Sequence, residues 1–246
     1  MTKLIVANWK MNGNLTKIDH DINCYLSNNL TNQNNVVLAI PYPFIITAIN
    51  KLKQHNSPIN IASQDISKFD DFGAYTGEIS APMLHEIGIN YSIIGHSERR
   101  QNFNEKNNDL VQKITNAVNH QIIPILCIGE SLEVRQSNSY VDFLLKQLEC
   151  LKLVTAKIDK LVIAYEPIWS IGSGLIPQLS EIEEAMVLIH KFMQNNLPHV
   201  RISTLYGGSV SAKNAVDVLN TYLVNGVLVG GASLNVNDFT AICGSC

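Results

Sequence analysis

The chain has 246 residues, of which 46% are hydrophobic and 16% are charged, and its formal net charge is −3. This composition is typical of a folded globular protein and excludes an intrinsically disordered chain. The small negative charge provides no basic surface for nucleic acid and no polybasic patch for a membrane. A small molecule is therefore the expected partner.

Targeting signals and cysteines favour a cytoplasmic protein. No stretch approaches the roughly 18 to 20 consecutive apolar residues that span a bilayer, and the apolar run after Lys3 is too short for a signal peptide. The five cysteines are dispersed and odd in number, which indicates reduced thiols. Cys243 and Cys246 form a C-x-x-C pattern. We expect an inert, frayed tail there, because no second Cys/His pair and no following helix accompany the pattern.

Short apolar runs recur along the chain at intervals of about 23 to 41 residues. They are continuous rather than alternating, as in parallel strands that are buried on both faces. The runs are LIVAN, VVLAI, INIAS, YSIIG, IIPILCI, LVIAY, ISTLY and GVLVGG.

Amphipathic segments separate these runs, and residues 180–195 are the clearest helix. Ser180 and Glu183 are spaced as a capping box, and an apolar stripe follows, comprising Ile182, Met186, Ile189 and Met193. Residues 28–35 are rich in asparagine and are predicted to form a loop. Eight strands alternating with helices, without a linker, predict an α/β fold: a (β/α)8 TIM barrel in which residues 1–246 form a single domain.

The active site of such a barrel lies at the carboxyl ends of its strands. Polar residues and glycines follow several predicted strands, namely Asn8 and Lys10, His96 and Glu98, Glu166, the stretch Tyr206 to Ser209, and Gly230 with Gly231. Taken singly, each has an ordinary structural explanation as a surface charge, a solvated loop acid or a turn glycine. Their joint placement at one end of the barrel favours a site.

The residue types point to proton transfer on a phosphorylated substrate. The glycine pairs after the last two strands leave backbone N–H groups available for phosphate. With no metal-ligand cluster and no dinucleotide fingerprint in the sequence, side chains must do the chemistry. Glu166 suits a general base, while His96 and Lys10 would polarise a carbonyl. His96 opens a predicted helix, whose dipole favours a neutral imidazole.

Six motifs carry a resemblance along almost the whole chain: ANWKMNG, GAYTGEIS, IIGHSERR, AYEPIWSIGSG, LYGGSV and VGGASL. In this order they resemble the triosephosphate isomerase family. The resemblance implies interconversion of glyceraldehyde 3-phosphate and dihydroxyacetone phosphate through an enediolate, without a cofactor or a metal. It implies Glu166 as the base, His96 as the electrophile, and Lys10 and Asn8 on the substrate, with Glu98 in a supporting role.

The resemblance also assigns the phosphate site and a lid. The residues implied to bind phosphate through N–H groups are Gly172, Ser209, Gly230 and Gly231. Residues 167–169 would form a stiff hinge, and Ser170 to Gly174 a lid that keeps water from Glu166. A homodimer is implied as well, through the loop around Thr76, which would meet Asn8 and Glu98 of the other subunit.

One departure from the family pattern concerns the end of the lid. Leu175, Ile176 and Pro177 stand where the family usually has a lysine, a small polar residue and an alanine. In the family, the tyrosine that matches Tyr206 bonds to the backbone N–H at the position of Pro177. Proline has no N–H. We therefore expect one hydrogen bond of the closed lid to be missing, at a cost of about 0.5 to 1.5 kcal/mol. A stiffer hinge would offset part of that loss.

Two other functions remain open at the level of the sequence. A Schiff-base aldolase would need a lysine at a strand's carboxyl end; Lys160 precedes its predicted strand, so Lys10 is the only candidate. A barrel that serves only for binding or adhesion is the second alternative. The joint presence of Lys10, His96 and Glu166 weighs against it.

Overall fold

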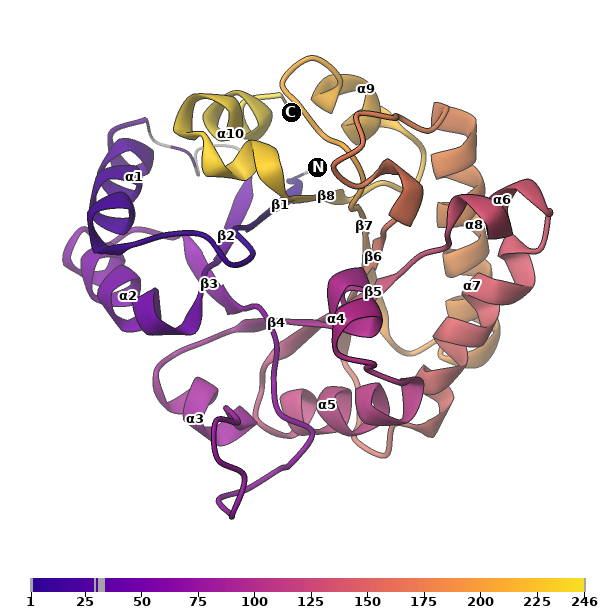
Figure 1. Ribbon diagram of the computed structural model, residues 1–246, viewed down its shortest axis with the longest axis horizontal. Coiled ribbons are helices and arrows are strands. Elements are labelled where there is room, and N and C mark those ends of the chain that lie inside the picture. The colour runs from indigo at the N-terminus through magenta and orange to yellow at the C-terminus, as the bar shows by residue number, and fades with distance from the viewer. Residues whose placement is uncertain (1, 29, 31–33, 246) are drawn as a thin grey trace.

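Residues 2–28, 30 and 34–245 are described by the structure, which is a computed structural model. Its eight strands are parallel and close into a barrel in chain order, with β8 paired to β1 (Figure 1). The strands are β1 (Leu4–Asn8), β2 (Asn35–Ala39), β3 (Asn60–Ser63), β4 (Tyr91–Ile94), β5 (Ile123–Ile128), β6 (Lys160–Tyr165), β7 (Arg201–Tyr206) and β8 (Gly226–Val229). The predicted (β/α)8 barrel is confirmed.

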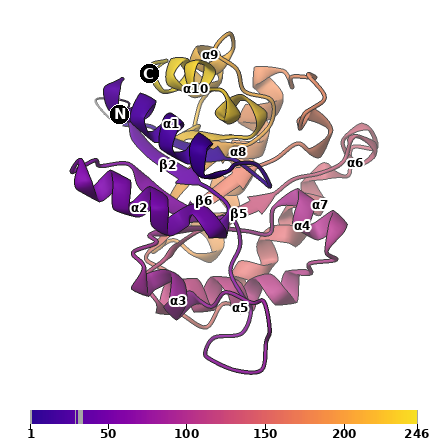
Figure 2. The same ribbon diagram turned by 60° about the vertical axis from the view of Figure 1, so that its left-hand side comes forward.

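Helices surround the barrel and cover its outer face (Figures 1 and 2). They are α1 (Leu15–Ser27), α2 (Ile45–Gln54), α3 (Ala81–Glu86), α4 (Ser97–Asn102), α5 (Asn107–Asn119), α6 (Leu132–Gln136), α7 (Tyr140–Leu148), α8 (Leu179–Asn196), α9 (Ala215–Asn220) and α10 (Val236–Cys243). Four 3-10 turns accompany them: η1 (Tyr42–Phe44), η2 (Glu149–Leu153), η3 (Ile168–Ser170) and η4 (Gly231–Leu234). Among the described residues, no helix is long and apolar enough to cross a membrane.

Two apolar layers follow from the alternation of side chains along each strand. Leu4 and Val6 of β1 point into the barrel, where they join one cluster with residues such as Ile125. Ile5 and Ala7 point outward and pack in a second, larger cluster with the helices. Both faces of the strands are therefore buried, which explains why the sequence shows continuous apolar runs.

The helix predicted at residues 180–195 begins earlier and has a different cap. α8 starts at Leu179, and its capping box joins Gln178 to Glu181, so the prediction of Ser180 and Glu183 is wrong. The carboxylate of Glu181 accepts from the backbone N–H of Gln178 at 2.8 Å, and the N–H of Glu181 donates to the carbonyl of Gln178 at 2.9 Å. A glutamine at the N-cap is unusual, and the sequence pattern favoured the serine. The predicted apolar stripe is buried.

The carboxyl terminus also differs from the prediction of a frayed tail. Cys243 is the last residue of α10 and is only 4% exposed, because that end of the helix packs into the outer apolar layer. The prediction for Cys246 concerns a residue outside the described part of the chain. In the asparagine-rich stretch, Asn28 caps α1 and Asn35 already belongs to β2; residues 29 and 31–33 lie outside the described residues.

Candidate active site

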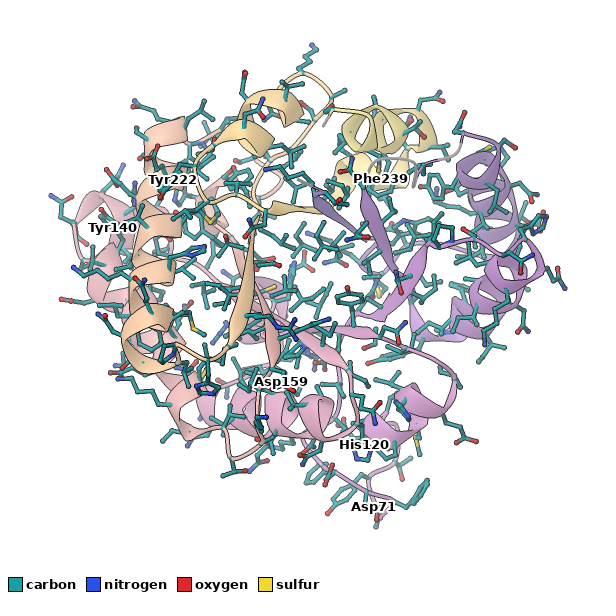
Figure 3. The ribbon with its side chains drawn as sticks, turned by 180° about the vertical axis from the view of Figure 1, so that it is seen from behind. Asp71, His120, Tyr140, Asp159, Tyr222 and Phe239 are labelled. Atoms are coloured by element: carbon teal, nitrogen blue, oxygen red, sulfur yellow. The ribbon has the colours of Figure 1, made fainter. Side chains whose placement is uncertain are left out.

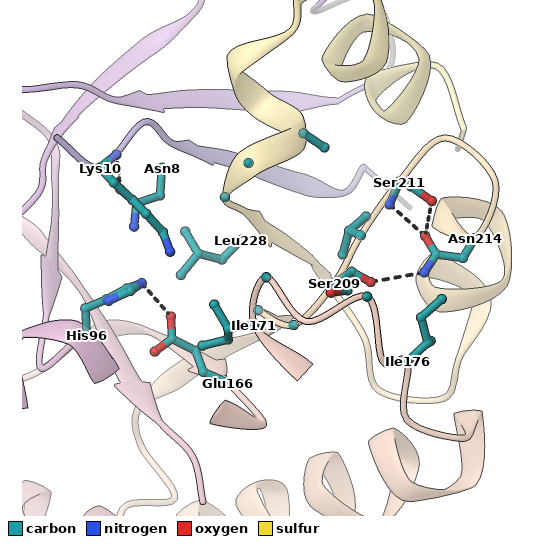
Figure 4. Close-up of a pocket in the computed structure, with 18 residues that line it drawn as sticks. Asn8, Lys10, His96, Glu166, Ile171, Ile176, Ser209, Ser211, Asn214 and Leu228 are labelled. Carbon is teal, nitrogen blue, oxygen red and sulfur yellow. Dashed lines mark hydrogen bonds and ion pairs between the residues drawn. The ribbon is translucent and has the colours of Figure 1, made fainter. Parts of the chain in front are cut away.

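A pocket of about 470 Å³ opens at the carboxyl ends of the strands (Figure 4). This volume falls within the range of small-ligand sites, ~300 to 1,000 Å³. Eight residues predicted from the sequence line it together: Asn8, Lys10, His96, Glu166, Gly172, Ser209, Gly230 and Gly231. Glu98 and Tyr206 stand behind this wall, the first against Lys10 and the second against Ser170.

Glu166 follows β6 directly and is only 2% exposed. Two glycines give it room. A Cβ on Gly129 would lie 1.7 Å from the Glu166 carbonyl oxygen, and a Cβ on Gly207 would lie 2.9 Å from its Cγ. The N–H of Gly207 donates to the carbonyl of Tyr165 at 2.8 Å. We expected the glycines after β7 to offer free N–H groups to a phosphate, but Gly207 instead makes room for the side chain of Glu166.

The carboxylate of Glu166 is held by two groups from the loop after β4. Oε1 lies 3.1 Å from Nε2 of His96, and Oε2 accepts from the backbone N–H of Ser97 at 3.2 Å. His96 caps α4, and its Nδ1 accepts from the N–H of Glu98 at 3.2 Å. Since Nδ1 must be unprotonated to accept this bond, the single ring hydrogen is on Nε2. The geometry therefore describes a neutral imidazole whose donor faces the pocket.

Lys10 is fixed in a backbone conformation that side chains rarely adopt, with φ at +52°. Its N–H donates to Oδ1 of Asn8 at 3.0 Å, and its carbonyl accepts from Gln64 at 2.8 Å. The ammonium group lies 2.5 Å from Oε1 of Glu98. Strain of this kind persists where the surroundings over-determine it. Gln64, which our sequence analysis missed, is one of those surroundings.

Cys127 is a second residue that the sequence analysis did not single out. It points into the barrel from β5 and is fully buried. Burial raises the pKa of its thiol, and the adjacent Glu166 carboxylate raises it further. The thiol therefore stays neutral and forms part of the dry wall behind the acid. Only its position relative to Glu166 reveals this, since an isolated cysteine in a strand carries no signal.

The segment after Glu166 forms one side of the pocket. Ile171, Gly172, Gly174 and Ile176 line it. Gly172 and Gly174 have φ values of +66° and +78°, a region that glycine occupies without strain. These two positions explain why the sequence places glycines in a loop that also carries large apolar side chains.

Glu130 anchors the start of this segment and was also missed. It is fully buried, and its Oε1 accepts from the Tyr165 hydroxyl at 2.8 Å and from the Trp169 indole at 3.4 Å. Burial raises the pKa of Glu130, and these two hydrogen bonds lower it by a smaller amount. The N–H of Ile168 also donates to the Glu130 carbonyl at 3.0 Å. The turn η3 is thus tied to the loop after β5.

Tyr206 has a hydrogen-bond partner despite Pro177. Its hydroxyl lies 3.2 Å from Oγ of Ser170. The hydroxyl of Ser170 also donates to the carbonyl of Leu175 and accepts from the N–H of Ser209, so it lies at the centre of the lid's contacts.

Other groups that bear on the chemistry lie elsewhere. Lys160 is the first residue of β6 and pairs with Arg201 at the amino-terminal mouth of the barrel, as the sequence indicated. Within residues 2–28, 30 and 34–245, no cluster of three or more His, Cys, Asp or Glu side chains is arranged to hold a metal ion.

Fold and pocket together define an α/β-barrel protein with a buried carboxylate, a neutral imidazole and an ammonium group at its carboxyl-terminal mouth. The family model for triosephosphate isomerase matches residues 3–246. The chain belongs to the triosephosphate isomerase family.

Relatives in two bacterial genera support this assignment. A triosephosphate isomerase of Francisella tularensis subsp. mediasiatica (strain FSC147) is 40% identical over 250 residues, which cover 98% of this chain and 96% of the relative. A triosephosphate isomerase of Orientia tsutsugamushi (strain Ikeda) is 39% identical over 246 residues, which cover 98% and 97%. The similarity thus extends over essentially the whole barrel.

Proposed function

We propose that this protein is an isomerase that interconverts glyceraldehyde 3-phosphate and dihydroxyacetone phosphate, a step of glycolysis and gluconeogenesis. The observation that carries the proposal is the convergence of Glu166, His96 and Lys10 on one pocket of a barrel in this family. We further propose that residues 1–246 act as a single domain and work in the cytoplasm.

The carboxylate of Glu166 removes a proton from the carbon next to the carbonyl group. The electron pair of the broken C–H bond forms the C=C bond of an enediolate, and the carbonyl oxygen takes up the charge. Nε2–H of His96 and the ammonium group of Lys10 stabilise that oxygen. The hydrogen of the adjacent hydroxyl group then moves to the charged oxygen, a transfer in which His96 exchanges hydrogens with the two oxygens. Glu166 returns its proton to the neighbouring carbon while the oxygen that lost its hydrogen becomes the new carbonyl, so atoms and charge balance without a cofactor.

The phosphate would bind at the other end of the pocket. Gly230 and Gly231 follow β8, and the place of a Cβ on Gly231 has no atom within 4 Å. Backbone N–H groups there, together with those of Gly172 and Ser209, suit an anion. Ile171 and Ile176 present apolar side chains to the same pocket. A lid closing over the phosphate would exclude water from Glu166 and protect the enediolate from losing phosphate.

A coupled assay for triose phosphate isomerisation tests the proposal. Glu166→Asp shortens the side chain by one methylene, a displacement of about 1 Å, and we expect kcat to fall roughly 100-fold. Glu183→Asp on the exposed face of α8 makes the same chemical change and should leave the rate unaltered. A wild-type protein without turnover contradicts the proposal.

Borohydride reduction in the presence of dihydroxyacetone phosphate separates this chemistry from that of a Schiff-base aldolase. The ammonium group of Lys10 is paired with Glu98 at 2.5 Å, which favours a charged lysine over a nucleophilic amine. We expect no covalent adduct by mass spectrometry. An adduct on Lys10 would favour the aldolase.

The proposed homodimer is supported by exposed apolar side chains at one part of the barrel mouth. They follow four consecutive strands: Met11 after β1, Ile46 after β2, Phe72 and Tyr75 after β3, and Phe103 after β4, with exposures from 44% to 95%. The loop between β3 and α3 extends away from the barrel, as Figure 2 shows, and Asp71 marks its outer part in Figure 3. Patches of this kind mark protein interfaces.

Phe72→Glu tests the interface, and Tyr222→Glu is its control. Phe72 is 74% exposed and Tyr222 is 62% exposed, but Tyr222 lies across the barrel from Asp71 (Figure 3). We expect Phe72→Glu to produce monomers by analytical ultracentrifugation and to reduce activity, because Lys10 and His96 lose support from the neighbouring subunit. A fully active monomer would refute this.

A further inference from the structure

Ser170 differs from the lid residues that follow it. It ends η3 and is fully buried, whereas residues 172–176 are exposed. Its Oγ donates to the carbonyl of Leu175 at 2.8 Å and accepts from the backbone N–H of Ser209 at 3.1 Å. The same oxygen lies 3.2 Å from the hydroxyl of Tyr206. One hydroxyl group thus joins both ends of the lid to the loop after β7.

Counting hydrogens fixes the direction of each bond. A serine hydroxyl has one hydrogen to donate and two lone pairs to accept. The Leu175 carbonyl can only accept and the Ser209 N–H can only donate, so Ser170 gives its hydrogen to Leu175 and receives one from Ser209. The remaining lone pair accepts from the Tyr206 hydroxyl. Every hydrogen-bonding capacity of the Ser170 hydroxyl is therefore used.

Two neighbours show that this cluster is closely built. A Cβ on Gly208 would lie 2.2 Å from the Tyr206 hydroxyl oxygen and 2.8 Å from Oγ of Ser170, so only glycine leaves room for them. The hydroxyl of Ser209 donates to the carbonyl of Ser170 at 2.5 Å, which adds a second bond between the same two residues.

The backbone N–H of Ser209 therefore has two alternative acceptors, the Ser170 hydroxyl and the phosphate group of a substrate. Ser209 lines the pocket with Lys10 and Gly230, and its N–H is one of the donors assigned to phosphate in the proposed function. In the structure that N–H is bonded to Ser170. A Cβ at Gly172 would meet no atom within 4 Å, so the tip of the lid is not packed against its surroundings. The lid is held at its ends, and its tip is free to move.

We propose that Ser170 is a positioning residue: its hydroxyl holds the lid in the arrangement seen here and competes with the substrate's phosphate group for the N–H of Ser209. When phosphate takes that N–H, the bond to Ser170 is lost and the ends of the lid are released. Phosphate binding and lid release are then one exchange of hydrogen bonds. This inference rests on the proposed function.

Inorganic phosphate, as a competitive inhibitor and as a ligand in calorimetry, provides the test. Ser170→Ala leaves the Ser209 N–H without its acceptor, and phosphate supplies a new one. We expect phosphate to bind roughly two- to tenfold more tightly than to wild type, the effect of about one hydrogen bond. Ser173→Ala is the matched control. Its hydroxyl bonds to Trp169 and Leu175 within the same lid, and its loss should leave phosphate affinity unchanged.

The exchange rate of the Ser209 amide hydrogen provides a second measurement, and a purely structural role of Ser170 would not make that rate depend on phosphate. In wild type the Ser209 amide should be protected with or without phosphate. In Ser170→Ala it should exchange faster, and phosphate should restore the protection. Unchanged or weaker phosphate binding by Ser170→Ala, or unchanged exchange at Ser209, overturns the proposal.

Tyr206→Phe keeps the test decisive should Ser170→Ala fail to fold. It removes one donor to Ser170 but leaves the Ser209 bond, so phosphate should bind more tightly by a smaller factor. In a foldable Ser170→Ala background the same change should add nothing, because its acceptor is already absent. Equal effects in both backgrounds contradict a shared cluster. A wild-type protein that neither isomerises triose phosphate nor binds phosphate contradicts the proposed function instead.

Discussion

The two halves of the pocket are held together in different ways. In the half that carries Lys10, His96 and Glu166, charged or ionisable side chains are fixed directly at strand ends by partners from several strands. In the lid half, Ser170 and Ser209 contact each other and nearby backbone groups of two loops. In the first half His96 and Glu166 are buried, and the partners of the three side chains come from several loops. The contacts of the lid half lie in two loops, so its hydrogen bonds can be broken and replaced locally.

This difference fits the demands of the proposed chemistry. Stabilising an oxyanion requires donors that do not reorganise during the reaction. A lid must open and close in every turnover, so its contacts have to be individually weak and replaceable. Changes in the fixed half should therefore affect kcat strongly, and changes in the lid half should affect affinity modestly.

The largest effect is expected for Lys10→Met. The substitution removes a charged donor from the oxyanion site while keeping most of the apolar stem, and we expect kcat to fall about 100- to 1,000-fold in the coupled assay. Lys157→Met, at an 83% exposed side chain, is the control. The thermal unfolding temperatures of both variants show whether a loss of activity comes from the missing charge or from a destabilised fold. If Lys10→Met keeps more than about half of its activity, the fixed half does not carry the chemistry.

An intermediate effect is expected for Pro177→Ala, which creates an N–H at the end of the lid. If that N–H gives the Tyr206 hydroxyl a partner in the closed lid, an enediolate analogue should bind roughly two- to tenfold more tightly. Pro198→Ala, beyond the end of α8, is the control. Should neither affinity for the analogue nor lid closure change, the missing N–H is unimportant in this protein.

The smallest effect is expected for the pH dependence of stability at Glu130, which ties η3 to the loop after β5. Burial raises the folded-state pKa of Glu130 above its ordinary value of 4.5, so its contribution to stability is present below that value and is lost as pH rises through the folded-state pKa. Glu130→Gln keeps an acceptor for Tyr165 and Trp169 but does not ionise.

Urea unfolding of wild type and Glu130→Gln at a series of pH values checks this. The free energy of unfolding of wild type should decline relative to that of the variant as pH rises from 4.5 towards neutrality. Parallel curves would show that Glu130 ionises equally in both states. The corresponding change at exposed Glu133 should leave the curve unchanged.

Errors of the sequence-based predictions cluster where local patterns compete. The pair Ser180 and Glu183 has the same spacing as the pair Gln178 and Glu181, and either could form a capping box. Only the folded chain shows that the second pair begins α8. A terminal C-x-x-C pattern looks exposed until α10 packs Cys243 against the outer apolar layer. Gly207 resembles a phosphate-binding glycine, yet its role is steric, next to Glu166.

The sequence by itself determined the barrel, its order of strands and the set of polar residues at the strand ends, because continuous apolar runs and strand-end positions are local properties of the chain. Tertiary structure alone decided which of these residues touch. Gln64, Cys127, Glu130 and the Ser170 hydroxyl contact the site from segments far apart in sequence or across a loop, and such contacts depend on closure of the barrel in three dimensions.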